Sequence, residues 1–148
     1  MINPVALFTL ISLLAASPAE KPERVTLHGT VLTLSQALKS SKLPVDAEPA
    51  DKQVVIKTET GELIPLLSND ASRALFLDAR LQNRDAEVHA LRHKNLPYLQ
   101  VVSFKIRDQG KLRTPEYYCE ICTIRVRFPQ TCPCCQGEMV LRMSPESP

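Results

Sequence analysis

Residues 117–143 read YYCEICTIRVRFPQTCPCCQGEMVLRM and contain all five cysteines of this 148-residue chain. The cysteines form two C-x2-C pairs, with a fifth inside the second pair: Cys119 and Cys122, then Cys132 and Cys135, with Cys134 between these two. Two such pairs separated by a short segment are typical of one tetrahedral metal ion held by four thiolates. The stretch therefore predicts a small metal-held unit, since so few residues cannot bury a sufficient core unaided.

The second cysteine pair carries turn chemistry that suits a metal site. Pro133 fixes φ where the chain turns around the ion. Gly137 permits the positive φ that lets backbone N–H groups point at sulfur, and such donors stabilise thiolates. A disulfide does not need these turns, so the sequence favours bound metal. Two disulfides with one thiol left over are the alternative.

The two knuckles, residues 118–122 (YCEIC) and 132–137 (CPCCQG), resemble those of zinc ribbons and of the short rubredoxin-type domain. The chain departs from the usual pattern at Thr123 and Gln136, where a glycine is common in such knuckles. The resemblance implies one Zn²⁺, or iron in a rubredoxin-like site. Cu(I) is a further alternative, because it prefers soft thiolates and low coordination numbers.

Cys134 is the unusual member of the cluster. Because it stands between two ligands, it cannot easily point at the same ion. It is interpreted as a spare reactive thiol, as a ligand in an alternative register, or as a small tolerated residue.

Three nearby arginines could offset the negative charge of a tetrathiolate site, or could simply form the solvated face of a hairpin: Arg125, Arg127 and Arg142.

The residues between and after the knuckles have the alternation of strands. Residues 123–128 alternate cleanly, Pro129 and Gln130 turn the chain back, and residues 139–143 form the returning strand. The tail is therefore expected to be a C-terminal zinc-ribbon β-hairpin.

The preceding residues predict a mainly β fold. Strands are expected at 24–34, 52–58, 62–67, 86–92 and 98–107, and one helix at 70–83. This order resembles that of an OB-fold, a small barrel with a helix between its third and fourth strands. We therefore expect a small OB-like five-stranded barrel with one helix over residues 24–110, followed by a Cys-rich zinc ribbon over 111–148. An α+β sandwich would give similar patterns.

Two strands change the face on which their apolar residues lie. In the first strand the change predicts a bulge near Gly29 to Val31, and in the last strand it falls at Val101 and Val102. Residues 35–51 are polar, contain two prolines, and are expected to be a turn-rich connection.

No catalytic arrangement is evident outside the cysteine cluster. His89 and His93 would stand about 13 Å apart in a strand, so we expect ordinary surface histidines, and His28 is isolated. Asp78 and Glu87 are interpreted as lone acids on solvated faces. We therefore assign no enzymatic activity from the sequence.

The N-terminus predicts export. Residues 4–16 (PVALFTLISLLAA) are apolar and uncharged, and Ser17 and Ala19 fit a signal-peptidase site. Residues 1–19 are therefore interpreted as a signal peptide cleaved after Ala19, or else after Ala16. An uncleaved membrane anchor and a buried first element are the alternatives. Residues 116–143 also resemble the tail of small uncharacterised exported bacterial proteins, which implies a location and supplies no activity.

Three functions are compatible with these observations. The first is an exported, periplasmic or secreted, non-enzymatic zinc-binding protein that serves interaction or assembly with an unknown protein partner. The second is a redox or metal-handling protein with iron or Cu(I). The third is a nucleic-acid binder, which requires that residues 1–19 be retained in the cytoplasm. A net charge of only +2 and few aromatic residues count against the third. The protein is expected to associate with a membrane only if residues 4–16 are an uncleaved anchor.

Overall fold

The computed structural model describes residues 21–144, apart from the side chain of Ser40. The expected signal peptide at residues 1–19 lies outside the described residues. No helix within residues 21–144 has the length and apolar character needed to cross a membrane.

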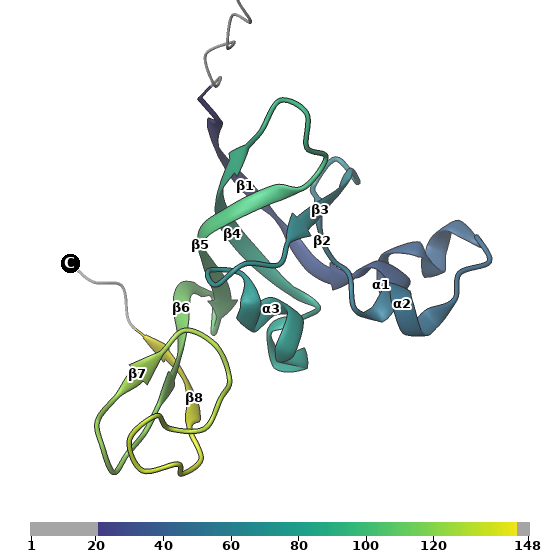
Figure 1. The fold of residues 1–148 in the computed structure, drawn as a ribbon. Coiled ribbons are helices and arrows are strands. Elements are labelled where there is room, and N and C mark those ends of the chain that lie inside the picture. Colours follow the sequence, from purple (N-terminus) through teal and green to yellow (C-terminus); the bar gives the residue numbers. More distant parts are fainter. Residues whose placement is uncertain (1–20, 145–148) are drawn as a thin grey trace, which may run out of the picture.

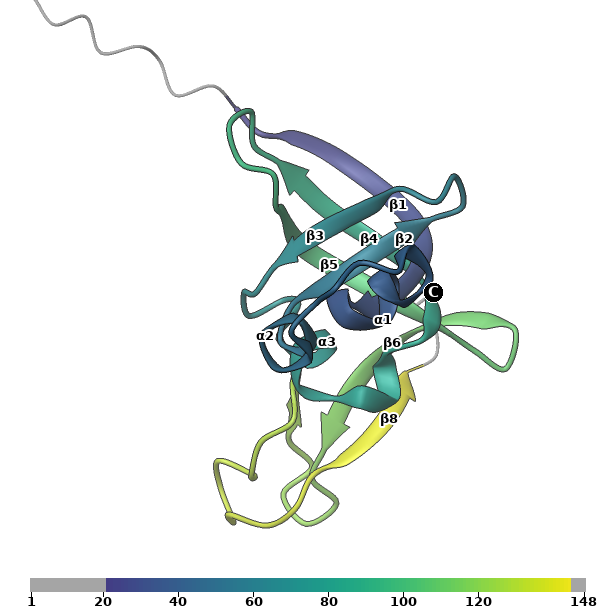
Figure 2. The ribbon, with the colours of Figure 1, turned by 90° about the vertical axis from the view of Figure 1, so that its right-hand side faces the viewer.

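Five strands wind into a ring at the centre of the molecule (Figures 1 and 2). They are β1 (Glu23–Thr33), β2 (Val54–Thr58), β3 (Leu63–Leu67), β4 (Arg84–Arg92) and β5 (Leu99–Asp108). Their order is β3-β2-β1-β4-β5, and a short parallel pairing of β3 with β5 closes the ring. A helix lies between β3 and β4. The expected mainly β class, with a five-stranded OB-like layout, is confirmed.

The expected bulge in β1 is wrong. β1 keeps an unbroken antiparallel register against both β2 and β4, and Val25, Leu27 and Val31 share the inward face. Gly29 is needed there for a different reason. A Cβ at this position would lie 2.2 Å from the carbonyl oxygen of Lys57 on β2, so only glycine permits the two strands to approach this closely.

The expected change of face in β5 is confirmed. The register between β4 and β5 shifts after His89, which pairs with Ser103, while the next residue pairs with Val101. Val102 is therefore the extra residue of a bulge. Its side chain is 51% exposed, whereas that of Val101 is buried.

Helical structure differs from the single helix expected at residues 70–83. That helix is short, with α3 at Arg73–Leu77 and a 3₁₀ turn, η2, at Ala79–Leu81, separated by Asp78 in extended conformation. The connection over residues 35–51 is also helical rather than turn-rich, with elements α1 (Leu34–Leu38), η1 (Lys39–Ser41) and α2 (Ala47–Asp51). A capping box explains the first of these, since Thr33 caps the helix and Gln36 reaches back to it.

The C-terminal ribbon has three strands, β6 (Lys111–Tyr118), β7 (Arg125–Val126) and β8 (Val140–Ser144). The expected hairpin between the strands that follow each knuckle is wrong, because β7 and β8 both pair with β6. The first residues of β6 also pair with the end of β5. β6 therefore continues from the barrel sheet into the ribbon, below the barrel in Figure 1.

One hydrophobic core joins the barrel to the ribbon. Buried barrel residues such as Leu75 and Ile106 belong to the same cluster as four residues of the ribbon: Tyr117, Cys119, Cys132 and Met139. The guanidinium of Arg73 on α3 also lies 4.5 Å from the ring centre of Phe128. The ribbon is thus held against the barrel by packing, and two of its cysteines belong to the shared core.

Candidate metal centre

Strand pairing brings the two knuckles together. The first knuckle directly follows β6 and the second precedes β8, and Tyr118 at the end of β6 pairs with Val140 at the start of β8. Both knuckles therefore emerge at the same end of the ribbon. Figures 1 and 2 show their loops side by side at the tip farthest from the barrel strands.

Four thiols converge there: Cys119, Cys122, Cys132 and Cys135. Their Sγ atoms all lie within 4.8 Å of one another, and those of Cys119 and Cys135 are 3.6 Å apart. A tetrahedral ion with Zn–S bonds of about 2.3 Å places its sulfurs about 3.8 Å apart. All five cysteines of the chain are free thiols in this structure. The four clustered thiols are positioned to hold a metal ion.

The two knuckles have the same backbone geometry. The N–H of Thr123 donates to the carbonyl of Cys119 (2.8 Å), and the N–H of Gln136 donates to that of Cys132 (2.9 Å). A second hydrogen bond closes each turn. In the first knuckle the N–H of Cys119 donates to the carbonyl of Ile124 (3.0 Å), and in the second the N–H of Cys132 donates to the carbonyl of Gly137 (2.9 Å). Each first cysteine is therefore held by backbone hydrogen bonds on both sides.

Gly137 does not supply the positive φ expected of it. Thr123 (φ 56°) and Gln136 (φ 60°) take the left-handed conformation instead, at the two positions where similar knuckles commonly have glycine. Gly137 lies in a tight space, because a Cβ there would lie 3.3 Å from the sulfur of Cys135. The knuckle geometry thus survives without the usual glycines.

Backbone N–H groups point at the sulfurs. The N–H of Cys122 donates to Sγ of Cys119 over 3.4 Å. The N–H groups of Cys135 and Cys134 hold the pKa of the Cys132 thiol down to about 7, even though burial opposes this. Hydrogen bonds between thiols, with Cys134 first and Cys135 next, raise the pKa of Cys122. The second knuckle therefore favours thiolate at Cys132 before any ion is considered.

Burial makes the cluster one-sided. Cys119 and Cys132 are 1% and 0% exposed, Cys122 is half-buried, and Cys135 is exposed. Each knuckle thus has a buried first cysteine and a more exposed second cysteine, so one side of the cluster is open to solvent. Cys134 is exposed on this open side and contacts Cys122, although it is not one of the four convergent thiols.

Two of the three tail arginines are engaged by other groups. Arg125 lies 3.7 Å from Glu116, and Arg142 lies 2.9 Å from Glu120 and 3.9 Å from the ring centre of Tyr118. Their charges are thus balanced by carboxylates on a solvated face. Arg127 instead lines a cavity between the ribbon and the barrel.

The interpretation of Asp78 as a solvated acid is wrong. Asp78 is 7% exposed, accepts a 2.6 Å hydrogen bond from the Tyr117 hydroxyl, and is paired with Arg80 at 2.7 Å. Burial alone would raise its pKa, but hydrogen bonds from Arg80 and Tyr117 lower it to about 2. Asp78, between α3 and η2, therefore connects the barrel by a hydrogen bond to β6, the strand that leads into the first knuckle.

The histidines are surface residues with local partners, as expected. His89, on β4, lies 3.0 Å from both Thr26 and Glu87. His93 follows the strand and lies 2.8 Å from Gln100. Within residues 21–144 they form no group able to hold a metal ion.

The chain was compared with protein-family models, with curated proteins and with solved structures, and none matched. The fold and the site therefore define this protein only by class, as a mainly β protein with an OB-like barrel and a C-terminal four-cysteine cluster of metal-binding geometry.

Proposed function

We propose that this chain is an exported zinc protein whose ribbon, residues 111–148, is folded around one structural Zn²⁺. The ligands are Cys119, Cys122, Cys132 and Cys135. The convergence of their four sulfurs within 4.8 Å carries the proposal. Four thiolates fill the tetrahedral shell of Zn²⁺ and leave no open position, which is the arrangement of structural rather than catalytic zinc sites.

The same closed shell supports a non-enzymatic role. Asp78 is the other conspicuous titratable group. Its carboxylate is already engaged by internal hydrogen bonds and one ion pair, with Arg80 and Tyr117 as partners. We propose that the barrel, residues 24–110, and the metal-held ribbon together present a surface for interaction or assembly with a protein partner. Signal cleavage after Ala19 would deliver this unit outside the cytoplasm.

A metal-handling role is the second candidate, and the position of Cys134 favours it. Its thiol is exposed and contacts Cys122, the half-buried member of the four. An additional thiol beside a tetrathiolate site can exchange with a ligand and pass a soft ion such as Cu(I) to an acceptor. Iron at the same four sulfurs would instead carry electrons.

Elemental analysis with intact-mass measurement, on protein purified from its native compartment, separates these functions. The structural proposal expects about one zinc per chain and free thiols. It also expects the intact mass of a chain whose first residue is Glu20. One iron or copper per chain would favour the second candidate. A metal-free protein carrying two disulfides would refute both.

A further inference from the structure

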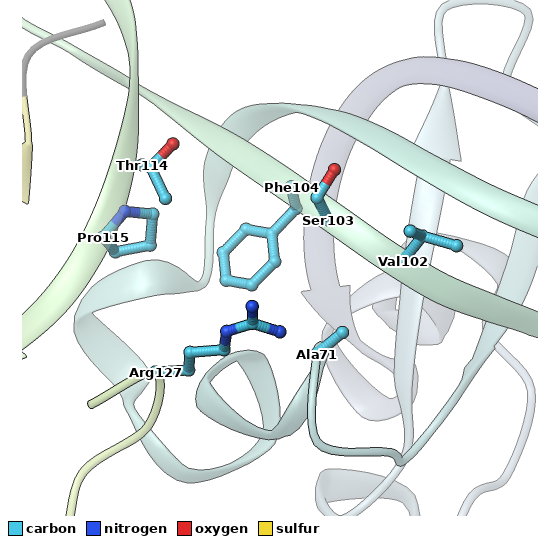
Figure 3. Close-up of a pocket in the computed structure, with 7 residues that line it drawn as sticks. All are labelled: Ala71, Val102, Ser103, Phe104, Thr114, Pro115 and Arg127. Atoms are coloured by element: carbon cyan, nitrogen blue, oxygen red, sulfur yellow. The ribbon is translucent and has the colours of Figure 1, made fainter. Parts of the chain in front are cut away.

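A cavity of about 160 Å³ lies where the ribbon meets the barrel. Figure 3 shows its walls. Phe104 and the bulged Val102 come from β5, Ala71 precedes α3, and Pro115 belongs to β6. Arg127, between the two knuckles, extends from the ribbon toward the ring of Phe104. The cavity lining thus combines mainly apolar groups with the side chains of Ser103 and Thr114 and one cationic group, Arg127.

The charge of Arg127 is unmatched. Within residues 21–144 its guanidinium forms no hydrogen bond, ion pair or ring contact, whereas the neighbouring Arg125 and Arg142 pair with glutamates. No acidic side chain lines the cavity. Figure 3 also shows the hydroxyl of Thr114 directed away from Arg127 and its methyl group turned inward. An anion in this cavity would meet one guanidinium among mainly apolar groups, with Ser103 as a further polar side chain of the lining.

The size of the cavity limits the ligand to a single small group. An apolar protein cavity of about 150 Å³ accommodates benzene, whereas pockets for larger organic ligands measure about 300–1,000 Å³. A nucleotide or an oligonucleotide segment is therefore too large. One aromatic ring or branched aliphatic side chain fits against Phe104 and Pro115.

The single guanidinium of the cavity also limits the charge of the anion. A guanidinium binds a carboxylate through two parallel hydrogen bonds. A phosphate dianion carries more charge and would need further donors to compensate for the water that it loses in an apolar cavity. The arrangement favours a monoanion.

We infer that this cavity binds a carboxylate attached to one apolar group, with the carboxylate on Arg127 and the apolar group against Phe104. Two sources supply this chemistry: a free aryl- or alkyl-carboxylic acid, and the C-terminal residue of a polypeptide. The site lies apart from the four cysteines. Its occupancy requires only that the ribbon be folded.

The inference is tested by NMR on the ¹⁵N-labelled full chain, with its metal content measured beforehand. Phenylacetate should produce saturable shifts at the amides of Phe104 and Thr114 and at the side-chain Nε–H of Arg127. Phenylacetamide, the uncharged control, should bind at least tenfold more weakly. Equal binding of acid and amide would overturn the proposal, as would tighter binding of phenyl phosphate or shifts that do not saturate.

Two variants locate the site, and a third is the control. Arg127→Gln should weaken phenylacetate binding about ten- to hundredfold, since a charge-assisted hydrogen bond contributes about 1.5–3 kcal/mol. Ala71→Leu should abolish binding by filling the cavity. Arg125→Gln, which removes an exposed arginine already paired with Glu116, should bind normally. Unchanged binding in Arg127→Gln, with metal content preserved, would refute the site.

A pair of ligands identifies the source. Acetyl-phenylalanine is compared with a six-residue peptide that ends in phenylalanine and has a free carboxylate. Tighter binding of the peptide assigns the cavity to polypeptide C-termini, and equal binding assigns it to small acids. If neither binds while the metal is retained, the inference fails and the proposed zinc site stands unaffected.

Discussion

At the scale of single residues, the ribbon depends on two backbone conformations beside the proposed metal ligands. Thr123 and Gln136 adopt φ values of 56° and 60°, which glycine tolerates far better than other residues. The left-handed conformation costs an L-residue about 1–2 kcal/mol. The paired backbone hydrogen bonds of each knuckle, together with the proposed ion, compensate for this strain.

Gln136→Gly should therefore strengthen the site. Relief of left-handed strain, reduced by the greater flexibility of glycine in the unfolded chain, leaves a gain of about 1 kcal/mol. That gain corresponds to roughly fivefold tighter zinc binding, measured by competition with a chromogenic chelator. Gln130→Gly is the matched control, because Gln130 has negative φ and should lose rather than gain affinity. Weaker zinc binding by Gln136→Gly would show that its conformation is not strained.

Cys134→Ser should keep its full zinc content, because Cys134 is not one of the four convergent thiols. It should also lose the fastest-reacting thiol of the folded protein, since Cys134 is exposed. Metal analysis and a thiol-titration time course measure these two outcomes. Cys135→Ser, which alters the adjacent residue, should lose the metal. Equal metal loss in both variants would mean that the ligand register is different.

The spacing of the cysteines alone predicted which four thiols converge, because two C-x2-C turns leave little freedom at each knuckle. The conformation of Gly137 was not predictable in the same way. Its neighbour Gln136 takes the left-handed turn, and the glycine instead lies close to the sulfur of Cys135, where a Cβ would be a tight contact. That contact depends on tertiary structure and leaves no local pattern in the sequence.

At the scale of elements, the joint between α3 and β6 connects the two parts of the molecule. Asp78 ends α3 and accepts the hydroxyl of Tyr117, two residues before the first metal ligand. The pKa of Asp78 is about 2 in the folded protein, below its ordinary value of 3.8. The interaction therefore stabilises the fold fully above about pH 4 and is lost as the pH falls through 2.

Asp78→Asn should lower the free energy of unfolding at pH 6 by about 1.5–3 kcal/mol, the usual contribution of hydrogen bonds to a charged group. The difference from the wild-type protein should shrink as the pH falls from 4 toward 2. Urea unfolding across this range measures it, and Asp46→Asn, an exposed acid whose side chain does not cap α2, is the control. A difference that stays constant with pH would contradict an ionised Asp78.

The barrel strands could be predicted because alternation and turn residues mark them locally. β6 was missed because its sequence contains Pro115, which argues against a strand interior. The helix over 70–83 was too long because its apolar period continues past Asp78, which is extended and whose side chain accepts from the N–H of Arg80 to cap the following 3₁₀ turn. The helices in residues 35–51 were missed because their sequence is polar and contains prolines.

At the scale of the whole molecule, the OB-like barrel and the ribbon share one core, and β6 belongs to both. Metal loss should therefore expose Tyr117 and weaken the joint at Asp78, while the ring of β1 to β5 keeps its own strand pairing. We expect the ribbon to be the part whose folding depends on the proposed ion.

Export is a property of the whole chain, and its test is the N-terminus of the native protein. The apolar run at residues 4–16 and the small residues at Ser17 and Ala19 predict a mature chain that begins at Glu20. N-terminal sequencing of protein recovered outside the cytoplasm should read Glu-Lys-Pro-Glu. An intact Met1 in cytosolic protein would contradict export, and an intact Met1 in the membrane fraction would indicate an anchor.

The central claim is that four cysteines hold one zinc ion, and X-ray absorption at the zinc edge on the native protein tests it most directly. The account predicts a first shell of four sulfurs at about 2.3 Å, with no nitrogen or oxygen ligand. The shell should be unchanged in Cys134→Ser and lost in Cys132→Ser. A shell with fewer than four sulfurs, or native protein without zinc whose cysteines are disulfide-bonded, would contradict the account.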